Sequence, residues 1–262
     1  MESATQQSGP REPKKMRTLA VIAVRDEESY LPGYFYHLRD FVDGFAVVDD
    51  GSLDKTAFLI KQEPKLKFSF RRDVRETDHF FEVENREILL RAAKELKAEW
   101  VLCCDADERY ESSFLKELTS IQDHAEEIKK PVVGLRVLGL WNSAYTYRID
   151  GSYGKLTKFV MFKVPNEISY TDRPHGSLHS PWLPSALRDA QFHWSTDWRI
   201  YHLRMIRPED RKIRFEKFRR IDPENKWQSI GYSHLLDETG LELKEIERGR
   251  EFNMRSLPNE IL

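Results

Sequence analysis

Three short apolar runs, each stopping abruptly at acidic residues, constrain the fold of this chain more than any other feature. They cover 17–24 (RTLAVIAV), 45–48 (FAVV) and 100–104 (WVLCC). Unbroken apolar runs of this length are typical of strands buried on both faces, as in a parallel sheet covered by helices. The acids that follow them are Asp26, Glu27 and Glu28; Asp49 and Asp50; and Asp105, Asp107 and Glu108.

Helical patterns separate these strands. Apolar residues at helical spacing predict helices over 30–42, with Ser29 as N-cap, and over 81–97; 52–62 is a shorter predicted helix. An alternating segment at 67–71 (KFSFR) predicts a third strand nearer a sheet edge, which makes 100–104 the fourth. This alternation predicts an α/β fold with a mainly parallel, Rossmann-like central sheet flanked by helices.

The pattern changes after Asp107. The sequence predicts a helix over 112–124, then a mixed sheet from strands 131–141, 155–164 and 198–203, with a loop over 142–154 and a basic helix over 204–221. We expect a disordered lead-in over 1–15, one domain over 16–221 with halves 16–111 and 112–221, and a C-terminal extension over 222–262.

Bulk composition excludes some classes of protein. The 262-residue chain has a formal net charge of −2, so it lacks the basic field that nucleic-acid binding requires. No stretch approaches the roughly 20 apolar residues of a membrane span, and 1–15 has no apolar core of a signal peptide, which predicts a cytoplasmic protein. Cys103 and Cys104 are adjacent in a predicted strand and point to opposite faces, which disfavours a disulfide between them.

The acids at the strand ends are expected to share one cleft. The carboxyl ends of parallel strands lie at one edge of a sheet, which is where open α/β sheets bind ligands. Crowded carboxylates repel one another unless a divalent cation, nearby arginines or a donor-rich base compensates them. Asp105 and Asp107, at i and i+2, can converge on one hard cation. Alternatively, they open a loop and cap the next helix.

Three segments in order, IAVRDEESYLPGY, FAVVDDGSLDKT and WVLCCDADERY, resemble the successive motifs of family 2 glycosyltransferases. The second segment matches the family pattern V-D-D-G-S-x-D-x-T, and Asp105-Ala106-Asp107 matches its D-x-D element. Asp26 departs from the family, which commonly has Asn there. The resemblance covers about 17–111 well and the remainder loosely.

The resemblance implies the GT-A fold and a hexosyltransferase-type enzyme that transfers a sugar from a nucleotide-diphospho-sugar, with inversion. Asp105 and Asp107 would hold Mn²⁺ or Mg²⁺ at the donor diphosphate. Asp49 or Asp50 would bind the base and ribose in a pocket also lined by Arg25 and Glu27. Arg86 would touch the pyrophosphate or base, or be a solvated helix residue. The half 16–111 would bind donor and metal, and 112–221 the acceptor.

Two further roles belong to the second half. Ile200-Tyr201-His202-Leu203-Arg204 resembles a family strand that supplies a histidine ligand, so His202 is expected either to complete the metal site or to be a packed structural residue. The general base is expected at Asp172 or His175, in YTDRPHG. The pair Glu209-Asp210 is more typical of a helix first turn.

Other functions stay open from the sequence. A nucleotidyl- or phosphotransferase could use a similar sheet, and a non-catalytic relative could keep donor binding alone. The acceptor could be a glycan, a lipid-linked compound or a small molecule. The basic segment 204–221 either caps the domain or rests on an anionic membrane at its inner face.

Overall fold

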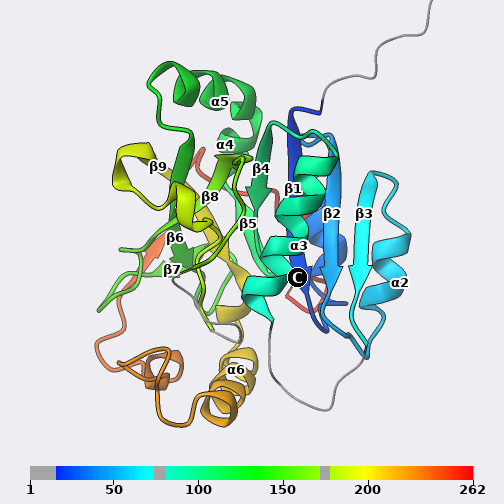
Figure 1. The fold of residues 1–262 in the computed structure, drawn as a ribbon. Helices are drawn as coiled ribbons and strands as arrows, with labels where there is room; N and C mark the ends of the chain where they lie inside the picture. The colour runs from blue at the N-terminus through cyan, green and yellow to red at the C-terminus, as the bar shows by residue number, and fades with distance from the viewer. Residues whose placement is uncertain (1–15, 74–80, 172–177, 262) are drawn as a thin grey trace, which may run out of the picture.

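The computed structural model describes residues 16–73, 81–171 and 178–261. Its main sheet has eight strands in the order β3-β2-β1-β4-β8-β6-β9-β5 and is flanked by helices, and β10 and β7 form a second, two-stranded sheet (Figure 1). The α/β architecture predicted from the sequence is therefore confirmed. The predicted lead-in over 1–15 lies outside the described residues.

The first half of the sheet is parallel throughout. β1 pairs with β2 and β4, and β2 pairs with β3, all in parallel register. Nearly every residue of β1, β2 and β4 is buried, as their unbroken apolar sequences predict, whereas β3 is largely exposed at the sheet edge. The strand bounds are β1 Thr18–Val24, β2 Gly44–Asp49, β3 Leu66–Arg71 and β4 Trp100–Cys103.

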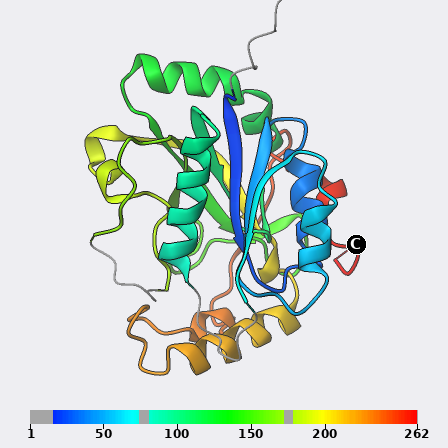
Figure 2. The ribbon, with the colours of Figure 1, turned by 45° about the vertical axis from the view of Figure 1, so that its right-hand side comes forward.

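Helices cross between these strands and cover the sheet. α3 packs over β1 and β2 on one face, and α1 lies behind the sheet (Figures 1 and 2). The predicted helices are found with shorter ends: α1 Leu31–Leu38, α2 Thr56–Lys61 and α3 Glu82–Glu95. The predicted Ser29 cap is wrong, because the N-cap position of α1 is Tyr30 and no side chain bonds to the helix end.

The second half of the sheet is mixed, as predicted. β8 is antiparallel to β4 and β6, β9 is parallel to β6, and β5 is antiparallel to β9. These strands are β5 Glu108–Tyr110, β6 Val132–Gly139, β8 Thr157–Lys163 and β9 His193–His202. The predicted helix 112–124 is two helices, α4 Ser112–Lys116 and α5 Leu118–Glu127. The predicted loop 142–154 contains β7, Thr146–Arg148.

The C-terminal part joins this architecture. α6 (Pro208–Ile221) lies at the end of the molecule toward which β1, β2 and β3 point (Figure 1). β10 (Leu243–Glu245) pairs with β7, and Phe252 and Leu257 are buried in the main core. Cys103 and Cys104 are buried and unbonded. Among the described helices, none combines the length and apolar character that crossing a bilayer requires.

Candidate active site

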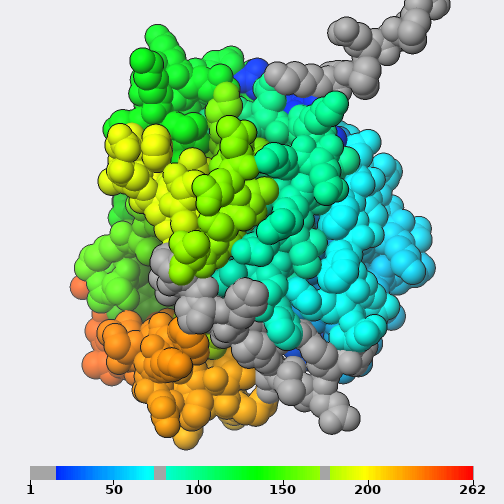
Figure 3. Space-filling view, in the orientation of Figure 1, coloured from blue at the N-terminus to red at the C-terminus, as the bar shows by residue number. Residues whose placement is uncertain are grey.

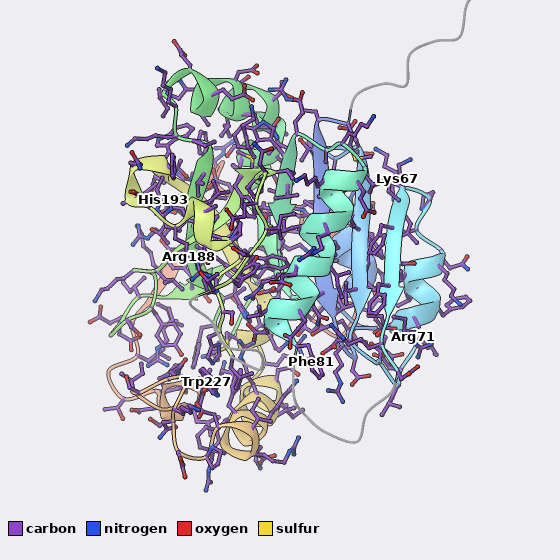
Figure 4. The ribbon with its side chains drawn as sticks, viewed as in Figure 1. Lys67, Arg71, Phe81, Arg188, His193 and Trp227 are labelled. Atoms are coloured by element: carbon purple, nitrogen blue, oxygen red, sulfur yellow. The ribbon has the colours of Figure 1, made fainter. Side chains whose placement is uncertain are left out.

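The acids singled out in the sequence meet at one edge of the sheet. Val24, at the end of β1, pairs with Asp49, at the end of β2, and β4 delivers Asp105 and Asp107 beside them. Figure 4 labels Arg71 at the same end of β3 and Phe81 at the nearby start of α3. Parallel pairing therefore produces the acidic edge that the sequence predicts.

Arg204 bridges the acids that follow β1 and β4. Its Nε donates to Asp107 Oδ2 at 2.7 Å, its Nη2 donates to Glu27 Oε2, and its guanidinium lies 4.7 Å from the centre of the Tyr30 ring. Burial raises the pKa of Glu27 to about 7, although Arg204 opposes the shift. Burial also acts to raise the pKa of Asp107, but His202, Arg204 and Arg214 outweigh it and hold that pKa well below its ordinary value. Asp107 is thus a fixed negative charge.

A second cation holds the other acids. Lys158, on β8, places Nζ 2.7 Å from Asp105 Oδ2 and 2.7 Å from Glu108 Oε2. The Asp105 side chain is 48% exposed, whereas Glu108 is buried. Partial desolvation acts to raise the pKa of Asp105, yet Lys158 outweighs it and lowers that pKa. Of the two predicted metal ligands, Asp105 is therefore the one open to solvent.

His202 reaches Asp107 through strand pairing. Glu108 of β5 lies opposite His202 of β9, which puts His202 Nε2 3.7 Å from Asp107 Oδ2 and 3.2 Å from Arg214 Nη1. Burial lowers the pKa of His202 to about 4, and Asp107 only partly offsets it, so the imidazole is neutral at pH 7. Its Nδ1 is buried with no hydrogen-bond partner among the described residues.

Asp49 and Asp50 are fully buried and paired with arginines. Asp49 Oδ1 accepts from the Ser52 amide at 2.8 Å, and its Oδ2 lies 3.1 Å from Arg71 Nε. Asp50 Oδ1 lies 3.2 Å from Arg72 Nε. Arg71 and Arg72 are site residues that the sequence analysis missed, since they follow an edge strand with no motif of their own.

The turn after β1 explains the departure from the family pattern. Asp26 has a φ of +55°, its amide donates to Ser52 Oγ at 3.0 Å, and its Oδ1 accepts from the Leu53 amide at 2.7 Å. Asp and Asn both tolerate this left-handed conformation, so Asp26 can replace the usual Asn. Arg25 is half-buried beside it. Burial lowers the pKa of the Lys217 amine, and Arg204, Arg214 and Arg25 add to that lowering.

Arg86 is buried and held by the second half of the chain. Its Nη1 donates to the Ser180 carbonyl and, at 3.2 Å, to the Pro181 carbonyl; Nη2 lies 3.2 Å from Glu82. Its charge still lowers the pKa of Asp105. Arg86 therefore joins the segment around Ser180 to the acidic edge. The two residues predicted to include the general base, Asp172 and His175, lie outside the described residues.

The predicted metal ligands lie near one another but are paired with cations. In the described part of the chain, no three His, Cys, Asp or Glu side chains are grouped closely enough to hold a metal. Two carboxylates and a neutral imidazole nevertheless form a donor set that suits Mn²⁺. Asp107, with His202 beside it, and the exposed Asp105 fit this role chemically. Lys158 and Arg204 supply positive charge at both carboxylates.

The fold and the acidic edge together define a GT-A-type α/β domain. Within this class the chain belongs to glycosyl transferase family 2, whose model matches residues 19–169, more than half of the sequence. The class of enzyme is therefore glycosyltransferase. No curated protein sequence matched the chain.

Solved structures show distant likeness. S. aureus TarS, residues 1–349, aligns at 17% identity with a TM-score of 0.47, over 85% of this chain and 70% of that one. A longer S. aureus TarS chain aligns at 18% identity with a TM-score of 0.48, over 85% of this chain and 42% of that one. A putative nucleotide-diphospho-sugar transferase from Desulfovibrio desulfuricans G20 aligns at 8% identity with a TM-score of 0.39, over 85% of this chain and 95% of that one. This chain thus spans less than half of the longer TarS chain, and the family assignment rests on the family match alone.

Proposed function

We propose that this glycosyltransferase moves a hexose from a nucleotide-diphospho-sugar to an acceptor hydroxyl, with inversion and with a divalent cation at the acidic edge. The observation that carries the proposal is the convergence of three strand ends on one cluster of paired charges. Arg204 joins Glu27 to Asp107, and Lys158 joins Asp105 to Glu108. Such a cluster is suited to a ligand that carries a diphosphate and its own counter-ion.

The nucleoside would lie over the ends of β1 and β2. Asp49 and Asp50 would accept hydrogen bonds from base and ribose, with Arg25 and Glu27 at the sides of the pocket. The ion pairs of these aspartates with Arg71 and Arg72 fix the orientation of the carboxylates before the donor binds. Such preorganisation lowers the cost of ordering side chains on binding.

The diphosphate would lie near Asp105, Asp107 and His202, which would hold Mn²⁺ or Mg²⁺. A bound cation supplies Lewis-acid stabilisation to the diphosphate oxygens as the sugar departs. Arg204, Arg214 and Lys158 place fixed positive charge beside the same oxygens, where transition-state charge accumulates. Arg86 would act on the site through its charge, which lowers the pKa of Asp105.

The acceptor would approach from the second half of the chain. A glycan, a lipid-linked compound and a small molecule can each offer the hydroxyl that receives the sugar. Of the cations on α6, Arg211 is buried and Arg214 contacts Asp107, whereas Lys212 and Arg219 are exposed together with Ile213. Membrane contact through 204–221 would use this outward face.

A thermal-shift screen tests the donor site. UDP-, GDP- and dTDP-sugars are added with Mn²⁺, with Mg²⁺ or with chelator. A bound donor at about 100 times its Kd stabilises the fold by about 2.7 kcal/mol. Asp107→Asn should remove the cation-dependent part of the shift, and Asp40→Asn, which changes an exposed acid after α1, should leave it intact. The absence of any donor-dependent shift in the unaltered protein would contradict the proposal.

A further inference from the structure

We infer that His179 is the general base that takes the proton of the acceptor hydroxyl. This inference rests on the proposed function, because it needs a bound nucleotide-sugar. His179 was not among the residues that the sequence singled out. It lies four residues beyond His175, in the part of that segment that the structure describes.

A hydrogen-bond chain sets the tautomer of His179. Tyr232 Oη donates to Asp222 Oδ2 at 2.8 Å, so its oxygen is left to accept, and His179 Nε2 lies 3.3 Å from it. Nε2 therefore carries the proton in the neutral ring, and Nδ1 has the free lone pair. Nδ1 has no hydrogen-bond partner among the described residues. A histidine oriented by a tyrosine and a carboxylate in this way has the arrangement of a general base.

The backbone at His179 is strained and held from α3. Its φ is +55°, which is uncommon for a residue with a Cβ and tends to persist where the surroundings impose it. Glu82 imposes it here, since its two carboxylate oxygens accept from the amides of His179 at 3.2 Å and Ser180 at 2.9 Å. The exposed imidazole is thereby directed to one position rather than left on a free loop.

His179 connects to the acidic edge through α6. Its ring lies 5.3 Å from that of Phe218, and the Arg214 guanidinium lies 5.3 Å from the same Phe218 ring. Arg214 in turn is 3.7 Å from Asp107. Figure 3 shows α3 and the segment after α6 on the same face of the molecule. Figure 4 labels Trp227 on that segment. The backbone amide of Trp227 donates to Asp222 Oδ2 at 3.2 Å.

Partial burial, more than the neighbouring charges, favours the neutral and therefore basic form of His179. Burial lowers the pKa of the imidazole, Glu82 and Asp222 act in the opposite direction, and Arg214 and Arg86 add to the lowering. The other titratable groups that face it are Tyr232, whose pKa is raised, and His234. The net shift is downward, so the ring is neutral at pH 7.

The proton and the electrons balance in this step. The acceptor O–H proton goes to Nδ1, and the oxygen lone pair forms the bond to the anomeric carbon. The bond from that carbon to the diphosphate oxygen breaks, and its electron pair leaves with the nucleoside diphosphate. The resulting imidazolium donates through Nε2 to Tyr232, which Asp222 supports. Tyr232 and Asp222 are thus positioning residues.

The experiment measures nucleoside diphosphate release with water as acceptor. The probe is whichever of UDP-glucose, UDP-N-acetylglucosamine, GDP-mannose and dTDP-glucose stabilises the protein most. His179→Asn keeps a residue that tolerates positive φ but removes the base, and His179→Gly keeps the backbone and opens space for added imidazole. We expect at least 100-fold loss of kcat in both variants, donor Kd within twofold of the unaltered protein, and partial recovery of His179→Gly with imidazole.

Tyr232→Phe keeps the ring that stacks 4.6 Å from Phe218 and removes only the hydroxyl, so we expect about tenfold loss of kcat with unchanged donor Kd. Turnover of His179→Asn within threefold of the unaltered protein, or loss of turnover that imidazole does not restore, would overturn the assignment. Loss in Asp172→Asn or His175→Asn with retention in His179→Asn would place the base there instead. If the unaltered protein binds none of the four donors, the proposed function itself fails.

Discussion

Arg204 is the side chain on which the site depends most. It compensates two largely buried carboxylates, Glu27 and Asp107, which lie on loops that are 80 residues apart in the chain. Removing one partner of such a pair leaves an uncompensated charge in a poorly solvated place.

We therefore predict that Arg204→Gln lowers the free energy of unfolding by about 2 to 3 kcal/mol. Arg207→Gln is the matched control, because Arg207 pairs with Asp210 at 2.7 Å at the surface of the same segment. Exposed pairs are worth less than about 1 kcal/mol. Urea unfolding of the two variants measures the difference, and equal losses would show that Arg204 is an ordinary surface cation.

His37, on α1, gives a prediction about acid stability. It is 2% exposed, and burial, with the charge of Arg109, lowers its pKa to about 3 against the opposing backbone of Tyr110. Between pH 6.5 and 3 the unfolded chain binds a proton that the folded protein does not, so stability falls as the pH falls through this window. Going from pH 6.5 to 5 costs about 2 kcal/mol.

His37→Leu should abolish that part of the pH dependence, because leucine binds no proton in either the folded or the unfolded state. His124→Gln serves as the control, since this histidine is 51% exposed on α5. Urea unfolding at pH 7, 6 and 5 provides the measurement. A slope in His37→Leu equal to that of the unaltered protein would mean that His37 is not the group responsible.

At the scale of elements, α1 meets the C-terminal turn η5 (Met254–Ser256) through a glycine. A Cβ on Gly33 would lie 2.0 Å from the Ser256 carbonyl oxygen and 2.6 Å from Arg109 Nη2. Arg109 is fully buried, and its guanidinium donates to the Ser256 carbonyl at 2.9 Å and the Tyr30 carbonyl at 3.1 Å. The glycine thus allows the backbone of α1 to lie directly against η5.

We predict that Gly33→Ala destabilises the protein by about 1 to 3 kcal/mol, although alanine is the better helix former. Gly151→Ala is a useful comparison, because it has a φ of +58° but nothing within 4 Å of its Cβ, and we expect a cost of about 1 kcal/mol or less. Thermal unfolding measures both. A stabilised Gly33→Ala would show that α1 shifts freely away from η5.

Some strands could be predicted from the sequence, and others could not. The strands around Val21, Val47 and Val101 were predictable because their apolar runs need no long-range information. β5 was missed, since Glu108, Arg109 and Tyr110 resemble a loop until β9 pairs with them. That pairing sets His202 beside Asp107.

The charge partners could not be predicted for the same reason. Lys158 carries no local signal, and Arg204 appears in the sequence only as the last residue of the 200–204 motif. Only sheet register brings these two cations to Asp105 and Asp107, 53 and 97 residues earlier in the chain. The acids of the site were therefore predictable from strand ends, whereas the cations that oppose them were not. His179 likewise gains its partners from α3 and from the segment after α6.

At the scale of the whole molecule, the segment expected as an extension after residue 221 packs against both halves. Phe252 and Leu257 belong to the main core, and Ser256 accepts from Arg109. Removal of 252–262 takes away two buried side chains worth about 1.5 to 3 kcal/mol each and leaves Arg109 donors unpaired.

We predict that this truncation lowers the free energy of unfolding by at least about 4 kcal/mol, a large share of the 5 to 15 kcal/mol typical of a domain. Removal of 1–15, which the sequence predicts to be a disordered lead-in, should leave the melting temperature unchanged. Circular dichroism melts compare the two truncations. Equal melting temperatures for both would show that the C-terminal segment is an independent appendage.

The central claim is that the acidic edge holds the donor diphosphate together with a cation. Anomalous diffraction at the manganese edge tests it most directly, on crystals grown with Mn²⁺ and a nucleoside diphosphate. We predict one strong peak within coordination distance of Asp107, with Asp105 or His202 as a second ligand and the diphosphate on its other side. A nucleotide bound with manganese elsewhere, or at a site that Asp107 does not touch, would contradict the account.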